Sequence, residues 1–289
     1  RALSSGEVTT LSNGDEWGLS GATWTLGGAL TVAGSLTFKT GTLDVDTTNH
    51  YGVTVSNNWL NDGGVFTART GTVTMNAGAS GKTITAGQQN FYDLTLNNAS
   101  GGWTMTDVST TQTVTVGNTL TITAGTLTSS SGTLSVGGDF NNAGTFTHNS
   151  GTVAMTGTSK NITGGSSTTF NNLTISGTTG IDAAGSDVTV AALLTVDNTK
   201  TLTINTGRTV TLSGTSGTTL SLVGTITGAG RLTYKNTATA FPATGTISSI
   251  LRMDATTGDQ TIGGTNSATR TFGGLVEIYS NSAGTAITV

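Results

Sequence analysis

The sequence of 289 residues is poor in cysteine, charge and long apolar runs, and each shortage excludes something. There is no cysteine, so no disulfide holds the chain together. The 11 basic residues form no cluster of the kind that neutralises a phosphate backbone, so we expect no nucleic-acid partner. No apolar run approaches the roughly 18–20 residues of a transmembrane helix, so we expect a chain that does not span a membrane.

The residues that are abundant favour an all-β protein. Charged residues make up 9% of the chain and apolar residues 34%, while Gly (43 residues), Thr, Ser and Asn fill the difference. Thr suits a pleated surface, and Gly and Asn suit tight turns. The apolar residues are regularly spaced, which distinguishes the chain from a disordered one. The low charge also weakens the usual protection against self-association.

A three-residue motif recurs along the whole sequence: an apolar residue, then Thr or another small or polar residue, then an apolar residue. It reads LTV at Leu30, VTV at Val53, LTL at Leu94, LTI at Leu120 and LTI at Leu173. This alternation places the apolar pair on one face of a short strand and Thr on the other face. Gly- and Asn-containing turns separate the copies, and no segment has a helical period. We therefore expect short strands with one buried face and essentially no helix.

A longer segment of the sequence also repeats. FNNAGTFTHNSGTVAMTG at 140–157 matches WLNDGGVFTARTGTVTM at 59–75, so that Phe66 and Val73 recur 80 positions later as Phe146 and Val153. Related copies follow at Lys82 and Lys160, and a third copy starts at Gln260. Repetition at a fixed period is typical of repeat architectures. We expect the recurring apolar residues to form a buried core ladder, made of Phe66, Phe146, Phe91, Phe170, Phe272, Leu94, Leu173 and Leu275.

These features predict an all-β fold, a parallel β-solenoid (β-helix) of short irregular coils built on a super-repeat of about 80 residues. Variable coil length disfavours a propeller, and sandwich-like packing is the alternative. One continuous solenoid would comprise lead-in strands at 1–29, a first copy with an insertion at 30–119, a second copy at 120–193, divergent coils at 194–259 and a partial third copy at 260–289.

The phrase GDFNNAGTFTHNSGTVAMTGT, followed by ITGGSSTTFNNLTI, resembles the β-strand repeats of large exported bacterial surface proteins. These include autotransporter passengers, filamentous-haemagglutinin-like adhesins and other extracellular filament-forming repeat proteins. The resemblance is clearest over 30–180 and 260–289. It implies an extracellular or cell-surface location and a role in adhesion or scaffolding, and it implies no shared catalytic residues.

The chemistry-bearing residues are few and scattered. Asp44, Asp46 and Asn49 are the candidates for a metal site, because two carboxylates on one side of a strand and a nearby amide oxygen could begin a Ca²⁺ site. His50 and His148 fall at different places in the repeat, and the 15 acidic residues are spread along the chain. We therefore expect no catalytic residues, no cofactor and no enzyme activity, a polysaccharide-active β-helix enzyme being the less favoured alternative.

The two ends of the sequence suggest how copies would associate. Both carry strand patterns without a charged or proline-bearing cap, and exposed strand edges invite pairing with another chain. We expect a head-to-tail homopolymer, with Val8, Leu11, Ile287 and Val289 at the joint. The sequence thus predicts a non-enzymatic extracellular structural protein, a filament or surface-fibre subunit. The alternative is an adhesin or autotransporter-type passenger stalk that binds host surfaces or surface glycans.

Overall fold

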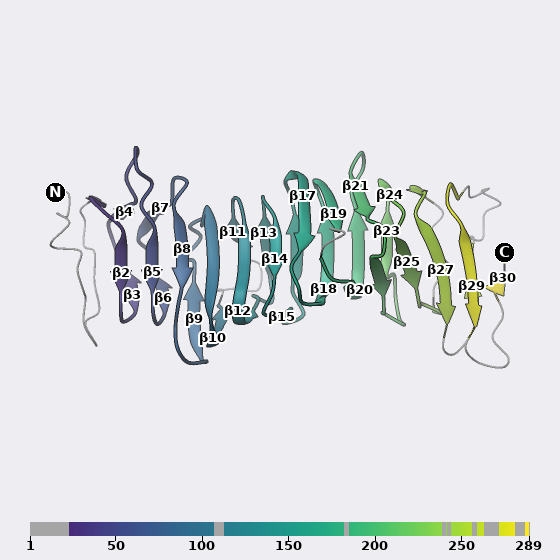
Figure 1. Cartoon of the computed structure of the whole chain (residues 1–289), viewed down its shortest axis with the longest axis horizontal. Coiled ribbons are helices and arrows are strands. Elements are labelled where there is room, and N and C mark those ends of the chain that lie inside the picture. Colours follow the sequence, from purple (N-terminus) through teal and green to yellow (C-terminus); the bar gives the residue numbers. More distant parts are fainter. Residues whose placement is uncertain are drawn as a thin grey trace. The chain divides into compact units, whose positions relative to one another are not determined.

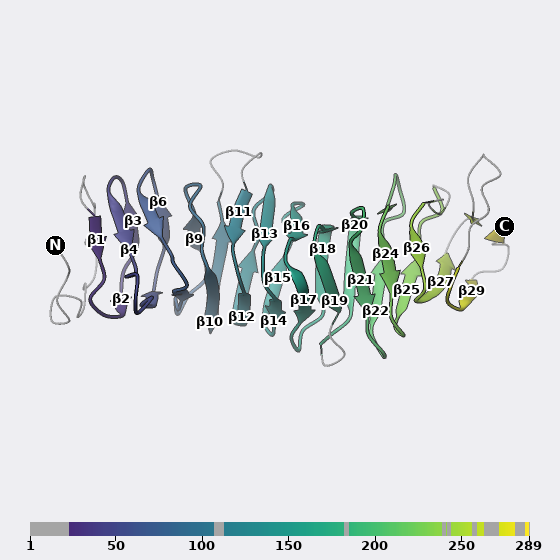
Figure 2. The same ribbon diagram turned by 90° about the horizontal axis from the view of Figure 1, so that it is seen from above.

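The computed structural model describes residues 23–106, 113–181, 185–238, 241, 244–255, 259–262, 272–280 and 287–288. Strands are the only regular elements in these segments, and they pair in parallel, as β8 does with β10 and β18 with β20. The chain divides into two compact units, residues 1–151 and 152–289. Within each unit the strands lie side by side (Figures 1 and 2), so each unit is a parallel β-solenoid, as the sequence predicts.

The described part of the first unit contains fifteen strands: β1 (Thr23–Thr25), β2 (Leu30–Val32), β3 (Leu36–Phe38), β4 (Thr42–Asp44), β5 (Val53–Val55), β6 (Trp59–Asn61), β7 (Val65–Thr67), β8 (Thr72–Met75), β9 (Lys82–Thr85), β10 (Asp93–Met105), β11 (Thr113–Val116), β12 (Leu120–Thr128), β13 (Thr133–Val136), β14 (Phe140–Asn142) and β15 (Thr145–Thr147). Three series of neighbours follow successive coils: β1-β4-β7, β3-β6-β9-β10 and β2-β5-β8-β10-β12-β14.

In the second unit, fifteen more strands lie within the segments given above: β16 (Thr152–Met155), β17 (Thr158–Thr163), β18 (Thr168–Ile175), β19 (Thr178–Ile181), β20 (Val188–Val196), β21 (Thr201–Ile204), β22 (Thr209–Leu212), β23 (Leu220–Leu222), β24 (Thr225–Thr227), β25 (Arg231–Tyr234), β26 (Thr246–Ile247), β27 (Ile250–Ala255), β28 (Gln260–Thr261), β29 (Val276–Ser280) and β30 (Ile287–Thr288). Its two long series are β16-β18-β20-β22-β25-β27-β29 and β17-β19-β21-β24-β26, and β28 pairs with β30.

The three-residue motif explains the core of both units. In the first unit one inward ladder is in register over six strands, and every member is at most 6% exposed. Its members are Leu30, Val53, Val73, Leu94, Leu120 and Phe140. The intervening Thr residues form an outward column in the same register. The ladder positions are 20 to 26 residues apart. The turns therefore absorb the variable coil length while the strands keep their register.

Some turns stack so closely that only glycine fits. A Cβ on Gly177 would overlap the carbonyl oxygen of Gly157 in the coil before it, because the two backbones meet there directly. Gly137 lies against Gly117 in the same way in the first unit. By contrast, a Cβ on Gly165 would meet nothing within 4 Å. The glycine content thus has a packing cause at particular corners of the coil.

Aromatic side chains fill the interior of the first unit. Trp59 lies 4.8 Å from Phe66, 5.2 Å from Phe91 and 5.0 Å from Phe38 between ring centroids, in tilted or edge-on arrangements. Such arrangements are the favoured geometries for aromatic pairs. Phe146 packs edge-on against Phe140 at 5.2 Å. The repeated segment of sequence therefore supplies aromatic residues of the core.

Six of the eight residues that the sequence predicts for the core ladder are buried. Phe66, Phe91, Phe146 and Leu94 in the first unit, and Phe170 and Leu173 in the second, are all at most 8% exposed. The Leu275 prediction is wrong, because 62% of that side chain is exposed. The register explains the error: Leu251 pairs with Val276, so Val276 takes the inward position that the sequence comparison gives to Leu275.

Phe272 departs from the prediction less severely. It is half-buried and pairs in an isolated bridge with Ile247, and its ring lies 6.1 Å from that of Phe241. The side chain thus contacts the core of the second unit without being enclosed by it.

Candidate functional sites

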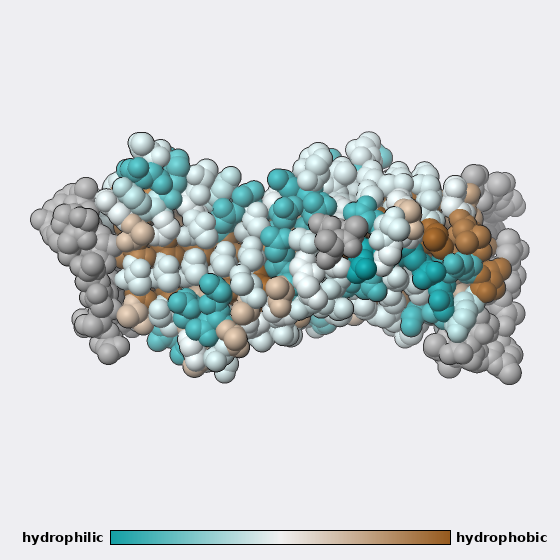
Figure 3. All heavy atoms as spheres, in the orientation of Figure 1, coloured by the Kyte–Doolittle hydropathy of each residue, from teal (hydrophilic) through white to brown (hydrophobic). Residues whose placement is uncertain are grey.

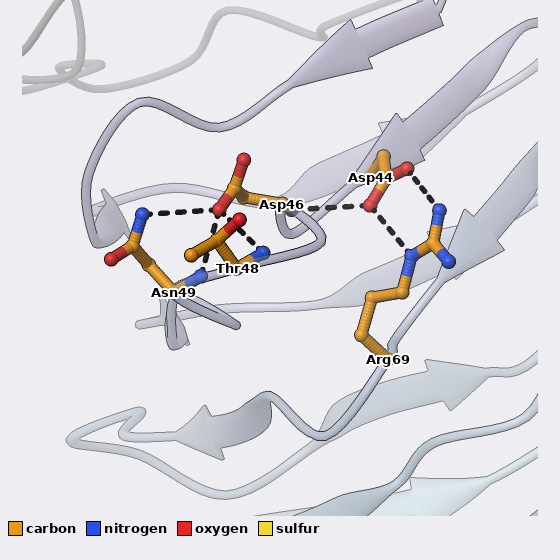
Figure 4. Close-up of polar contacts among 5 residues, drawn as sticks. All are labelled: Asp44, Asp46, Thr48, Asn49 and Arg69. Carbon is orange, nitrogen blue, oxygen red and sulfur yellow. Dashed lines mark hydrogen bonds and ion pairs between the residues drawn. The ribbon is translucent and has the colours of Figure 1, made fainter.

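A cluster of polar contacts lies at and after the end of β4 (Figure 4). Asp44, the last residue of β4, accepts two hydrogen bonds from Arg69, at 3.2 Å from Nε and 2.8 Å from Nη2. The Asp44 side chain is 13% exposed and that of Arg69 is 38% exposed. This hydrogen-bonded guanidinium holds the pKa of Asp44 below its ordinary value of 3.8, and the same pairing raises the pKa of Arg69.

The side chain of Asp46 stabilises the turn that follows β4. Its backbone has a φ of 78°, and its Oδ1 accepts hydrogen bonds from the backbone N–H groups of Thr48 (3.0 Å) and Asn49 (2.8 Å). The Asn49 side-chain amide donates to the same oxygen at 3.1 Å. The two backbone donors hold the pKa of Asp46 below its ordinary value. This carboxylate closes a local turn, as aspartates commonly do.

The structure does not support a metal site at Asp44, Asp46 and Asn49. β4 ends at Asp44 and the chain turns at Asp46, so the two carboxylates do not lie on one side of a strand as the sequence suggested. Arg69 already neutralises Asp44, and a second cation there would meet its charge. Within the described segments no group of three or more His, Cys, Asp or Glu residues could hold a metal ion.

The surroundings of the two histidines, His50 and His148, bear on whether either could take part in catalysis. His50 is half-buried and lies in a turn with a φ of 48°. His148 is exposed, and its Nδ1 accepts a hydrogen bond from the backbone N–H of Ser150 at 3.0 Å. Neither is paired with a nucleophile or a carboxylate by any contact found in the described residues. The absence of catalysis stays a prediction.

The outer face of the second unit carries hydroxyl groups in register. One column, Thr178, Thr201, Thr225 and Thr246, runs along β19, β21, β24 and β26. A shorter column consists of Thr203 on β21 and Thr227 on β24, which are also in register. Ser248 donates to the Thr227 hydroxyl at 3.0 Å, which links successive rows. This surface is neutral and polar, and it offers hydrogen-bond donors and acceptors without a charge.

The strand β29 has a different surface. Met253 on β27 is fully buried, but Ile278, the next residue of the same inward ladder, is 62% exposed. Leu275 and Tyr279 are also exposed, at 62% and 45%. Figure 3 shows hydrophobic surface gathered over this end of the second unit, where β27 and β29 lie. Among the described strands β29 pairs with β27 alone.

Side chains on the outward face of β29 make charged contacts with residues of β25 and β27. Arg231 on β25 reaches past β27 to Glu277 on β29, with Nε–Oε2 and Nη2–Oε1 distances of 3.1 and 3.2 Å. The Arg252 guanidinium lies over the Tyr279 ring, 3.8 Å from its centroid. Arg252 also lies 3.5 Å from Asp254. No sequence motif marks this cluster, because its members come from separate coils.

The residues expected at a head-to-tail joint are only partly placed. Val8, Leu11 and Val289 lie outside the described residues. Ile287 lies in β30, where it pairs with Gln260 of β28 in parallel. β29 is not among the strands expected from the sequence, although the alternation of apolar Val276, charged Glu277 and apolar Ile278 is typical of a strand.

Comparisons with protein-family models, with curated proteins and with solved structures find no match for this chain. Across the segments that the structure describes, no helix is long and apolar enough to cross a membrane.

Proposed function

We propose that this protein is a non-enzymatic structural protein of the extracellular space, a filament or surface-fibre subunit whose copies join end to end. The observation that carries the proposal is the incomplete ladder at β29. Each inward residue of this ladder before Ile278 is at most 1% exposed, namely Phe170, Val190, Leu212, Tyr234 and Met253. Ile278 alone in the ladder is left 62% exposed.

A strand from a second copy fits this surface. The ladder lacks one apolar residue over Ile278, and the outer edge of β29 has no partner among the described strands. An added strand would continue the backbone hydrogen bonds and place an apolar side chain on Ile278. The strands of this chain carry the required pattern, apolar at every second residue. Only 9% of the residues are charged, so little repulsion opposes the contact.

Such a contact joins two different surfaces, and a heterologous contact that does not close on itself produces a filament. From the sequence we expect Val8, Leu11, Ile287 and Val289 at the joint. We now place β29 on one side of it and keep the segment that contains Val8 and Leu11 as the other side. An extracellular location is supported by the cysteine-free, Thr-, Ser- and Gly-rich composition and by the resemblance to exported repeat proteins.

The test compares two matched substitutions in the purified chain. Ile278→Glu places a charge in the proposed joint, whereas Val223→Glu places the same charge on another exposed residue of the second unit (55% exposed). We expect the parent chain and Val223→Glu to form fibres as concentration rises, by light scattering and electron microscopy, and Ile278→Glu to remain monomeric. A parent chain that stays monomeric at high concentration contradicts the proposal.

The second candidate is an adhesin or autotransporter-type stalk, which the hydroxyl columns of the second unit favour. A neutral surface of this kind suits a surface glycan more than a charged ligand. The test compares binding to a glycan array by the parent chain and by a variant that carries both Thr203→Lys and Thr225→Lys. Binding that the double substitution removes, in a chain that forms no fibres, would favour the adhesin. Release of oligosaccharides from a polysaccharide panel would instead indicate an enzyme.

A further inference from the structure

We propose that β29, which pairs with β27 alone among the described strands, is a releasable strand fastened by charged contacts on its outward face, and that ionic strength controls its release. The proposal concerns the single chain and goes beyond the filament. Its starting point is the uneven distribution of contacts on the two faces of β29.

The inward face of β29 contributes little packing. Val276 is half-buried and Ile278 is 62% exposed, whereas Leu251 and Met253, their register partners on β27, are fully buried. Burial of apolar area is the main favourable term in holding a strand on a core. An interior strand such as β22 gains this term in full, since Val210 and Leu212 are 0% exposed. β29 gains only part of it.

The outward face supplies the specific contacts. Glu277 is paired with Arg231 through two hydrogen bonds, and this contact spans β27 to join β29 directly to β25. Tyr279 lies under Arg252, whose own strand is β27. Two-point carboxylate–guanidinium pairs and cation–π contacts are both electrostatic in origin. The side chains of Arg231 and Glu277 are 36% and 30% exposed, so dissolved ions reach the pair.

Screening therefore weakens the contacts that hold β29 while the interior of the unit is unaffected. The screening length shortens from about 10 Å at 0.1 M salt to about 3 Å at 1 M. Elements with few buried apolar contacts open locally while the rest of a domain stays folded. Release of β29 would expose the edge of β27 together with Leu251 and Met253. In the proposed filament, it would also remove the surface to which the next copy binds.

The experiment is amide hydrogen exchange on the purified full-length chain, at a concentration where it is monomeric, so that its outcome does not depend on filament formation. Exchange in residues 276–280 is compared with exchange in β22, at about 0.1 M and about 1 M NaCl. We expect 276–280 to exchange faster than β22 and to accelerate further at high salt, with β22 unchanged.

Variants assign the effect to the contacts. Glu277→Gln should accelerate exchange in 276–280 about fivefold at low salt and remove most of the salt dependence. Tyr279→Leu should act in the same direction, and Tyr279→Phe, which keeps the ring, should not. The matched control is Asp187→Asn, which removes the carboxylate 4.0 Å from Arg208 elsewhere in the unit. Equal exchange in β29 and β22, or full salt dependence in Glu277→Gln, would overturn the proposal.

Discussion

Val73 pairs with Leu94 in the first unit in the same register as Val153 pairs with Leu173 in the second. Met75 then pairs with Leu96, and Met155 with Ile175. The sequence repeat of about 80 residues therefore corresponds to a structural repeat, in which an equivalent pair of strands forms in the same register. Each copy brings an apolar strand onto the strand of the next coil, and both members of each pair are buried.

Leu173 tests this core directly. It is 0% exposed, so Leu173→Asp would bury a charge without a partner, and we expect a loss of about 4 kcal/mol or more in the free energy of unfolding. The control is Thr174→Asp on the outward side of the same strand, for which we expect less than about 1 kcal/mol. Urea unfolding of both variants is the measurement, and similar losses in the two would contradict the inward placement of Leu173.

Met253 and Ile278 lie in one ladder but differ in exposure, which predicts unequal costs of truncation. Met253→Ala leaves a cavity in a closed core and should cost about 2–5 kcal/mol in the free energy of unfolding. Ile278→Ala removes a side chain that is 62% exposed and should cost less than about 1 kcal/mol. Thermal unfolding of the monomer compares them. Equal costs would mean that Ile278 is covered in solution.

Gly177 and Gly165 provide a matched pair for the contact between coils. Gly177→Ala forces a Cβ against the carbonyl of Gly157, so the two coils must separate locally, and we expect a loss of about 2 kcal/mol. Gly165→Ala meets open space and should be neutral or slightly stabilising, because it reduces the freedom of the unfolded chain. Melting temperatures decide the matter, and a neutral Gly177→Ala would show that the turns do not touch.

Asp44 predicts a pH dependence. Its pairing with Arg69 lowers its pKa in the folded chain below the ordinary value of 3.8. The pairing therefore stabilises the fold at pH values above this ordinary pKa, and the contribution is lost as pH falls through the lower folded pKa. We expect Asp44→Asn to cost about 1 kcal/mol at pH 7, allowing for the solvent exposure of Arg69, and progressively less below pH 4. Denaturant unfolding of parent and variant across this pH range measures the difference. A cost that persists at low pH would assign the effect to packing.

Much of the fold could be predicted from the sequence, for a local reason. Alternation at Leu30, Val53 and Leu94 fixes which side of each strand is apolar, and glycine- and asparagine-rich turns fix where the strands end. The similarity of successive coils then favours parallel stacking, because like residues lie over like residues. These signals lie within a few residues of one another, so they are visible without the structure.

Only the tertiary structure decided which polar residues meet and which apolar residues lack cover. Asp44 and Arg69 are 25 positions apart, and Arg231 and Glu277 are 46 apart, so their pairing depends on the register and length of the coils between them. The same register moved the inward position from Leu275 to Val276. The sequence by itself thus determined the strands and the solenoid, whose pattern is repeated in every coil. The charged contacts and the open ladder at β29 arise from the summed lengths of irregular turns, which no single motif records.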